Sequence, residues 1–151
     1  MDIKQFESTF QFIGSSITNL KSSNGIRTIR DESSLTHEID TSYEITHCDE
    51  IEDDFVGILV LNITIKLKEQ KTKGKRLLIN VQIEGVFKAN KALGKDGFVN
   101  MLRINGTASL FSIARAFIMS LTSQMLLDGK VVIPLVNFYQ MEEKSTNSDT
   151  Q

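Results

Sequence analysis

The strongest hydrophobic pattern in the chain lies between Asn105 and Asp128. Apolar residues recur there at helical spacing, and an Asn-Gly-Thr start and an Asp-Gly stop flank them, so the pattern predicts one long helix. Further apolar residues lie off the main stripe, which predicts a helix that is buried on two sides. The stripe consists of Leu110, Ile113, Ala114, Phe117, Ile118, Leu121, Met125 and Leu126, and the other sides carry Phe111, Ala116, Met119 and Leu127.

A membrane span is the competing interpretation of this helix, but polar residues interrupt every apolar run that could cross a bilayer. Arg115 is the only charge inside the helix. A lone arginine in such surroundings needs a partner, and we expect a carbonyl or a carboxylate at an interface. A helix packed between its own domain and a second subunit therefore explains the pattern better. The interrupting residues are Thr107, Ser109, Ser112, Arg115, Ser120, Thr122, Ser123 and Gln124.

Apolar and polar positions alternate before the helix, as they do in strands. Leu35 to Cys48 is predicted to be a half-buried strand, Phe55 to Lys68 a long strand, and Leu77 to Lys88 its return. The chain from Phe10 to Leu20 is also predicted to be extended, with a bulge or bend at Gly14. Short links between successive strands imply a mostly antiparallel sheet. The inward residues are predicted to be Leu35, His37, Ile39, Tyr43 and Ile45, then Leu59, Leu61, Ile63, Ile65 and Leu67, then Leu77, Ile79, Val81 and Ile83.

The order of these elements predicts the α+β class: a four-stranded antiparallel sheet with one long C-terminal helix packed on it and at a subunit interface. Residues 89–104 are expected to be a connection with one or two helical turns, and residues 130–138 to run extended through Pro134. We expect residues 1–9 to be flexible, 10–139 to form a single domain, and 140–151 to be a disordered polar tail. One helix cannot cover such a sheet and also bury its own second face, so self-association is expected.

Composition narrows the class of protein. A chain of 151 residues with 24% charged and 40% hydrophobic residues is typical of one soluble globular domain. A net charge of −2 predicts no strong attraction to nucleic acid or anionic lipid. Cys48 is the only cysteine, which excludes an internal disulfide and is consistent with the reducing cytosol. The first residues lack the apolar stretch of a signal peptide, so we expect a cytoplasmic chain.

Candidate metal ligands and catalytic groups are few. In a regular strand His37 and His47 share a face but lie too far apart to share one ion, and Cys48 points away, so no metal site is expected. The carboxylates Glu38, Asp40 and Glu44 share a strand face without a nucleophile or histidine beside them. They are therefore interpreted as a solvated face rather than a catalytic pair. No Gly-rich phosphate-binding motif occurs, and we expect neither a cofactor nor enzyme activity.

The basic hairpin tip from Glu69 to Arg76 could contact nucleic acid. It lacks interleaved aromatic residues and lies opposite an acidic run, so a solvated turn is the better interpretation. We expect no nucleic-acid partner.

Three segments resemble the SecB family of protein-export chaperones. Gly85-Val86-Phe87, Leu110 to Arg115 and Ile133 to Phe138 are similar to that family's G-(I/V)-F strand end, L-F-P-Y-A-R helix start and L-P-x-V-N-F segment, in the same order. Phe10-Gln11-Phe12 and Asp54-Phe55 extend the resemblance, which covers about residues 10 to 138. It implies an ATP-independent cytoplasmic holdase for protein export, a homotetramer built as a dimer of dimers, that binds unfolded or pre-secretory polypeptides in apolar grooves.

The chain departs from the SecB pattern in three places. Ser112-Ile113 replaces the family's Pro-Tyr, and the second helix expected after Phe138 is short or absent. Neutral residues, Asn19, Ser23 and Asn80, stand where the family presents acidic side chains to the translocase motor ATPase. The neutral residues at these positions put hand-off to the motor by the family's usual contact in doubt. The alternative is a SecB-like chaperone or adaptor dedicated to one partner, such as an antitoxin.

Two sets of candidate site residues follow. The segments that precede and follow the long helix in the sequence carry apolar residues that can converge on a client-binding groove. These segments are rich in Met and Phe, whose side chains adapt to varied apolar partners. The alternative is that they complete the core. The groove residues are Phe98, Met101, Leu102, Ile104, Val132, Ile133 and Phe138, and the oligomer-interface residues are Phe111, Arg115, Phe117, Ile118 and Leu121.

Overall fold

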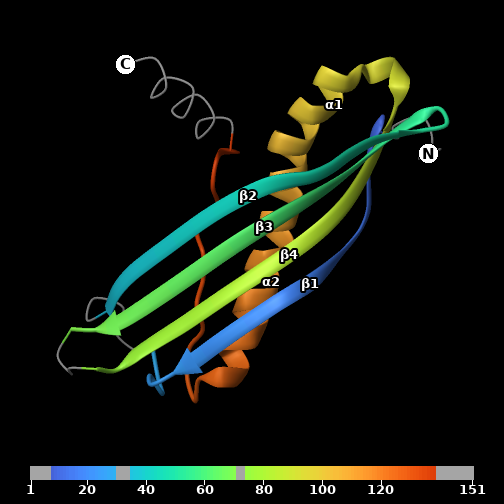
Figure 1. The fold of residues 1–151 in the computed structure, drawn as a ribbon. Coiled ribbons are helices and arrows are strands. Elements are labelled where there is room, and N and C mark those ends of the chain that lie inside the picture. The colour runs from blue at the N-terminus through green and yellow to red at the C-terminus, as the bar shows by residue number, and fades with distance from the viewer. Residues whose placement is uncertain (1–7, 30–34, 71–73, 139–151) are drawn as a thin grey trace, which may run out of the picture.

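The structure, a computed structural model, describes residues 8–29, 35–70 and 74–138. Four long strands form one antiparallel sheet, and a helix crosses one face of it (Figure 1). This arrangement confirms the predicted α+β class. The expected tail and most of the expected flexible N-terminus lie outside the described residues. The strands are β1 (Phe10–Asn24), β2 (Leu35–Ile51), β3 (Asp54–Glu69) and β4 (Arg76–Asn90).

The central strands β3 and β4 show the alternation that the sequence predicted. Every second side chain on them is buried beneath the helix, and the residues between them face the open side of the sheet. Burial of one face at a period of two is what fixes the register of these strands. The buried residues on the helix side are Phe55, Leu59, Leu61, Ile63, Ile65 and Leu67 of β3, with Leu77, Ile79, Val81, Ile83, Phe87 and Ala89 of β4.

The spatial order of the strands is β1-β4-β3-β2. Strand β1 pairs with β4, from Phe10 opposite Ala89 to Asn24 opposite Leu77, so β1 and β2 form the two edges. The described start of the connection between them, residues 25–29, lies beside the end of the helix, where Leu127 N–H donates to Arg27 O (2.8 Å). Strands β2, β3 and β4 follow one another through hairpins, and β1 lies beside β4. This arrangement is a Greek key.

Strand β2 differs from its prediction as a half-buried strand. Ile39 is 41% exposed and Tyr43 is 38% exposed, because β2 is an edge strand and the helix lies over β3 and β4. A bulge between Ile45 and His47 also reverses the faces beyond it. His47 therefore lies opposite Ile58 on the open face, whereas Cys48 lies opposite Gly57 on the helix side. The two histidines do not share a face, so the geometric argument in the sequence analysis was wrong on this point.

The helix begins ten residues earlier than the sequence predicted. It comprises α1 (Lys95–Met101), a π-helical turn (Leu102–Gly106) and α2 (Thr107–Met125). Asn105-Gly106-Thr107 is not a helix start, because Gly106 has α-helical dihedral angles and lies close to the sheet. A Cβ on Gly106 would lie 3.2 Å from Leu59 Cδ2. The glycine therefore provides close approach rather than a cap.

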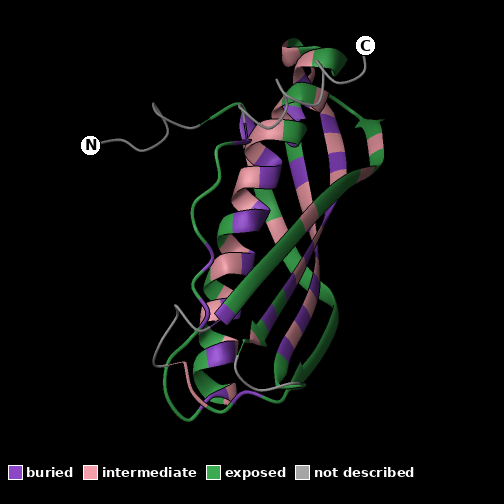
Figure 2. Ribbon diagram, turned by 90° about the vertical axis from the view of Figure 1, so that its left-hand side faces the viewer, coloured by how far each residue is buried: buried purple, intermediate pink, exposed green. Residues whose placement is uncertain are grey.

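The whole helical run Lys95–Met125 is long and apolar enough to cross a membrane by length and composition. In the structure its sheet-facing side is buried, which Figure 2 shows as the purple positions along the helix. The prediction of a helix packed on its own sheet is thus confirmed. The buried residues of α2 are Thr107, Leu110, Phe111, Ala114, Ile118 and Thr122.

Two glycines on the central strands allow the helix to lie this close. A Cβ on Gly57 would lie 2.6 Å from Leu102 Cδ1, and a Cβ on Gly85 would lie 2.5 Å from Leu110 Cδ2. Both distances are shorter than any ordinary contact between carbon atoms. Gly85 is the first residue of the Gly-Val-Phe segment that resembles the SecB family. In this chain the glycine leaves room for Leu110 of the helix.

Candidate functional site

Residues 129–138, which we call the C-terminal strap, run back along α2 without joining the sheet (Figure 1). Val131 N–H donates to Thr122 Oγ1 (2.9 Å), and Arg115 Nε–H donates to the carbonyl of Ile133. The Phe138 ring meets the Phe111 ring edge-on at 5.3 Å. The segment is extended, as predicted, and its anchor points lie along the length of the helix.

The first candidate site, which we call the edge groove, lies between β2, α2 and the strap. It has a volume of about 340 Å³. The lining is predominantly apolar, and Asp40 is the only charged residue in it among the residues that the structure describes. A hollow of this size, lined by aliphatic and aromatic side chains, suits apolar side chains of a bound molecule. The lining residues are Ile39, Asp40, Thr41, Phe111, Ile133, Pro134, Val136 and Phe138.

A second hollow, which we call the helix groove, lies on the other side of the strap. Its volume is about 550 Å³, and it borders the π-helical turn and the start of α2. Val136 and Phe138 line both grooves, so the strap is the wall between them. The other lining residues are Ile104, Asn105, Ala108, Ser109 and Asn137.

The seven predicted groove residues fall into three places. Phe98 and Leu102 are fully buried beneath the sheet, and half-buried Met101 packs against the same core. Val132 is 51% exposed and lines neither groove. The remaining three lie around the strap. Ile133 lines the edge groove, Ile104 lines the helix groove and Phe138 lines both.

Sequence reasoning missed most of the residues that line the edge groove, namely Ile39, Asp40, Thr41, Phe111, Pro134 and Val136. Ile39 had been placed on the inward face of a half-buried strand, Asp40 on the solvated face of that strand, and Phe111 at a subunit interface. The residues of β2 lie beside the strap because β2 is an edge strand. The alternation of apolar and polar residues does not reveal the order of strands in the sheet. The alternation of apolar residues on β2 predicted that Ile39 would be buried rather than exposed, so it gave no signal for the groove.

The five predicted interface residues are also distributed differently. Phe111 and Ile118 are buried within the chain, whereas Phe117 and Leu121 are half-buried against its core. Arg115 finds the expected carbonyl, but that carbonyl is Ile133 of its own chain. The outward face of α2 carries small and polar residues, namely Ser112, Ala116, Ser120, Ser123 and Gln124.

The two edges of the sheet differ in charge. Strand β1 contains a single charged residue, Lys21. Its exposed apolar residues, at 39–55%, are Phe12, Ile13, Ile17 and Leu20. Strand β2 instead carries five acidic residues, Glu38, Asp40, Glu44, Asp49 and Glu50. Charges on an edge strand discourage pairing with another strand, so β2 is protected against neutral strands and β1 is not.

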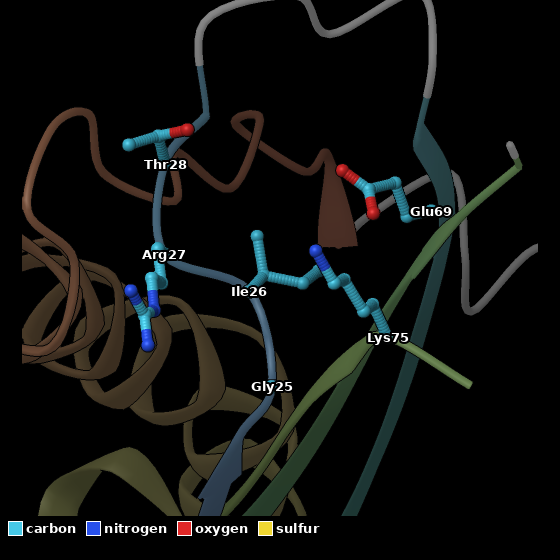
Figure 3. A pocket seen from close by; sticks show the side chains of 6 residues that line it. All are labelled: Gly25, Ile26, Arg27, Thr28, Glu69 and Lys75. Atoms are coloured by element: carbon cyan, nitrogen blue, oxygen red, sulfur yellow. The ribbon is translucent and has the colours of Figure 1, made fainter. Parts of the chain in front are cut away.

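A further hollow of about 380 Å³ lies at the end of the sheet where β1 ends (Figure 3). Glu69 and Lys75 project into it from one side and Arg27 lies across from them. Its polar and charged lining distinguishes it from the two grooves. Glu69 and Lys75 belong to the hairpin that the sequence analysis interpreted as a solvated turn.

Among residues 8–29, 35–70 and 74–138, no cluster of three or more His, Cys, Asp or Glu side chains could hold a metal ion. The ion pair of Lys91 Nζ with Glu50 Oε1 (2.7 Å) lies on the surface at the end of β2. The hydrogen bond from Lys91, and then its charge, lower the pKa of the Glu50 carboxyl. Lowered in this way, the carboxylate is a weak base, which suits an ion pair rather than acid–base catalysis.

No protein-family model matches the chain, and no curated protein matches it significantly. Among solved structures, the chain is similar to the SecB-like chaperone Rv1957 of Mycobacterium tuberculosis, solved in complex with a ChAD peptide from the HigA1 antitoxin. The TM-score is 0.62 at 10% identity, covering 84% of this chain and 90% of that one. A Streptococcus agalactiae protein of unknown function matches at a TM-score of 0.49 and 12% identity, over 83% and 96%. At 10% identity the likeness to Rv1957 concerns the fold alone.

Proposed function

We propose that this protein is an ATP-independent chaperone, a holdase that binds unfolded segments of other polypeptides in the edge groove. The observation that carries the proposal is the apolar lining of that groove between an edge strand, the helix and the strap. An unfolded client exposes the apolar side chains that such a hollow accepts, and its burial there removes them from water. The fold shared with a peptide-binding SecB-like chaperone supports this proposal. Protein export and a cytoplasmic location belong to the same proposal.

The proposal predicts that the chain suppresses aggregation of several unrelated unfolded proteins at stoichiometric amounts, as light scattering would show. Replacing Ile39, which lines the edge groove, by serine should weaken this protection several-fold, because the groove loses an apolar wall. Ile51→Ser is the matched control. Ile51 lies on the same strand, is 54% exposed and lines no groove described above. Equal protection by the two folded variants would rule out the edge groove as the client site.

The second candidate function is an adaptor dedicated to one partner, without hand-off to a translocase motor. The antitoxin peptide bound by the structural neighbour favours this candidate. The same assay separates the two functions. Broad protection of unrelated clients supports the general holdase, whereas protection of one co-encoded protein alone supports the adaptor.

We also propose that the chain self-associates through β1. An apolar strand edge that lacks repelling charges can pair with the same edge of a second copy, which joins the two sheets and covers Phe12, Ile17 and Leu20. The proposal predicts that light scattering finds a dimer or a larger assembly at micromolar concentration. Ile17→Lys should shift the assembly to monomer, because the pairing would then face two cations. A well-folded unmodified monomer under these conditions would refute it.

A further inference from the structure

The hollow where β1 ends, which we call the end pocket, lies between segments that hydrogen bonds hold in place. Gly25 N–H donates to Arg76 O (2.8 Å), which ties the segment after β1 to the start of β4. Glu69 N–H donates to Lys75 O (3.1 Å), which ties the end of β3 to the residue before β4. Buried Ile26 adds an apolar side chain to the lining. The walls of the end pocket, whose volume is about 380 Å³, are therefore fixed by the fold.

Three charged side chains line the end pocket. Glu69 and Lys75 project into it from one side, and Arg27 lies across from them (Figure 3). No ion pair within the described ranges 8–29, 35–70 and 74–138 involves any of the three, although a carboxylate and an ammonium share the same hollow. Two cations and one carboxylate give the lining an excess of positive charge.

The Glu69 carboxylate lacks a hydrogen-bond donor. Its Oε2 atom is shielded from solvent and has no hydrogen-bond partner among the residues that the structure describes. An acceptor that has lost water and gained no donor is costly, and more so when it carries a charge. A positively charged donor placed in the end pocket would remove this cost, because charge-assisted hydrogen bonds are the strong ones.

We propose that the end pocket binds a small acidic amino acid, a molecule with one ammonium group and two carboxylates. The ammonium donates to Glu69 Oε2, and the carboxylates accept hydrogen bonds from Lys75 and Arg27. Each charge of the lining then faces an opposite charge, and the overall negative charge of the ligand complements the positive excess of the lining.

This site is separate from the proposed client site. None of the residues that line the end pocket lines the edge groove or the helix groove. The inference therefore goes beyond the proposed chaperone function and does not depend on it.

The test is isothermal titration calorimetry of the full chain at low salt, with L-glutamate and with glutarate as ligands. Glutarate has the two carboxylates of glutamate but no amine. L-glutamate should bind saturably and about tenfold more tightly than glutarate, because only L-glutamate brings a charged donor to Glu69. Raising the salt concentration should weaken the binding of both ligands.

Three variants and one control locate the contacts. Glu69→Gln should abolish the preference for L-glutamate, weakening its binding and strengthening that of glutarate, because the negative charge that attracts the amine is removed. Arg27→Met and Lys75→Met should each weaken the binding of both ligands about tenfold, since each removes one charge-assisted hydrogen bond. Lys88→Met is the matched control, because Lys88 is exposed on β4 and lines no hollow described above. Circular dichroism checks that each variant is folded.

Each result decides the inference. The absence of saturable binding of L-glutamate to the unmodified chain would overturn it, and so would equal affinities for L-glutamate and glutarate. Affinities that neither Arg27→Met nor Lys75→Met reduces would place the ligand elsewhere and also overturn it. Suppression of aggregation is measured separately, so a failure of the end pocket leaves the proposed chaperone function standing.

Discussion

Replacing Gly85 by valine is expected to destabilise the folded chain by about 3 kcal/mol, because overpacking in a filled core forces side chains from their rotamers. A Cβ at this position would lie 2.5 Å from Leu110 Cδ2 and 3.1 Å from Phe87 Cε2. Both residues are fully buried, so neither can move aside into solvent. Urea denaturation followed by circular dichroism measures the loss in the free energy of unfolding.

Gly14→Val is the control for the loss of backbone freedom at a strand glycine. A Cβ on Gly14, in edge strand β1, would meet no described atom within 4 Å. We expect this variant to change the free energy of unfolding by well under 1 kcal/mol. Adding Leu110→Ala to Gly85→Val should recover part of the loss relative to the sum of the two single changes, since the smaller side chain vacates the clash. Equal stability of the two valine variants would contradict the close packing of helix and sheet.

Replacing Phe98 by alanine is expected to cost about 3–5 kcal/mol, the range for removing a buried aromatic ring. Phe98 is fully buried, stacks on Phe55 with ring centroids 5.6 Å apart and lies 6.0 Å from Phe10. The ring joins α1 to both β1 and β3. Thermal and urea unfolding would show the loss directly, and the variant is expected to unfold at a much lower temperature.

Met101→Ala provides the comparison within the same helix. Met101 is half-buried at the margin of the core, so we expect a loss of about 1 kcal/mol. Both residues were candidates for the client groove in the sequence analysis. If the Phe98→Ala variant were fully stable but failed to hold unfolded clients, Phe98 would be a residue of the client groove. The burial of its ring predicts instead that the variant loses stability.

The central part of the fold was predictable because its signals are local. Alternation at a period of two marks β3 and β4, whose helix-side residues are buried along nearly their whole length. Helical spacing marks α2 and its burial against the sheet. The partner of Arg115 was predictable in kind, since a half-buried guanidinium in apolar surroundings requires an acceptor.

The edges were not predictable, because strand order depends on contacts between distant parts of the chain. Ile39 and Tyr43 alternate like residues of a central strand, yet they are 41% and 38% exposed at the edge of the sheet. The helix start was misassigned because Gly106 provides space for Leu59 and Phe87, which only the packed structure reveals. The edge groove combines β2, α2 and the strap, so only the strap's Ile133 and Phe138 could be proposed from local pattern.

The pairing of β1 with β4 sets an order of events while the chain is being synthesised. Phe10 finds its neighbour only when Ala89 has emerged from the ribosome, whereas β2, β3 and β4 join by short hairpins as they appear. Closing the long loop between β1 and β4 carries the larger entropic cost, so the first strand made is the last to join the sheet. Until β1 joins the sheet, its apolar residues are exposed to solvent. The nascent chain is then prone to aggregate, as are the unfolded clients proposed for the folded protein.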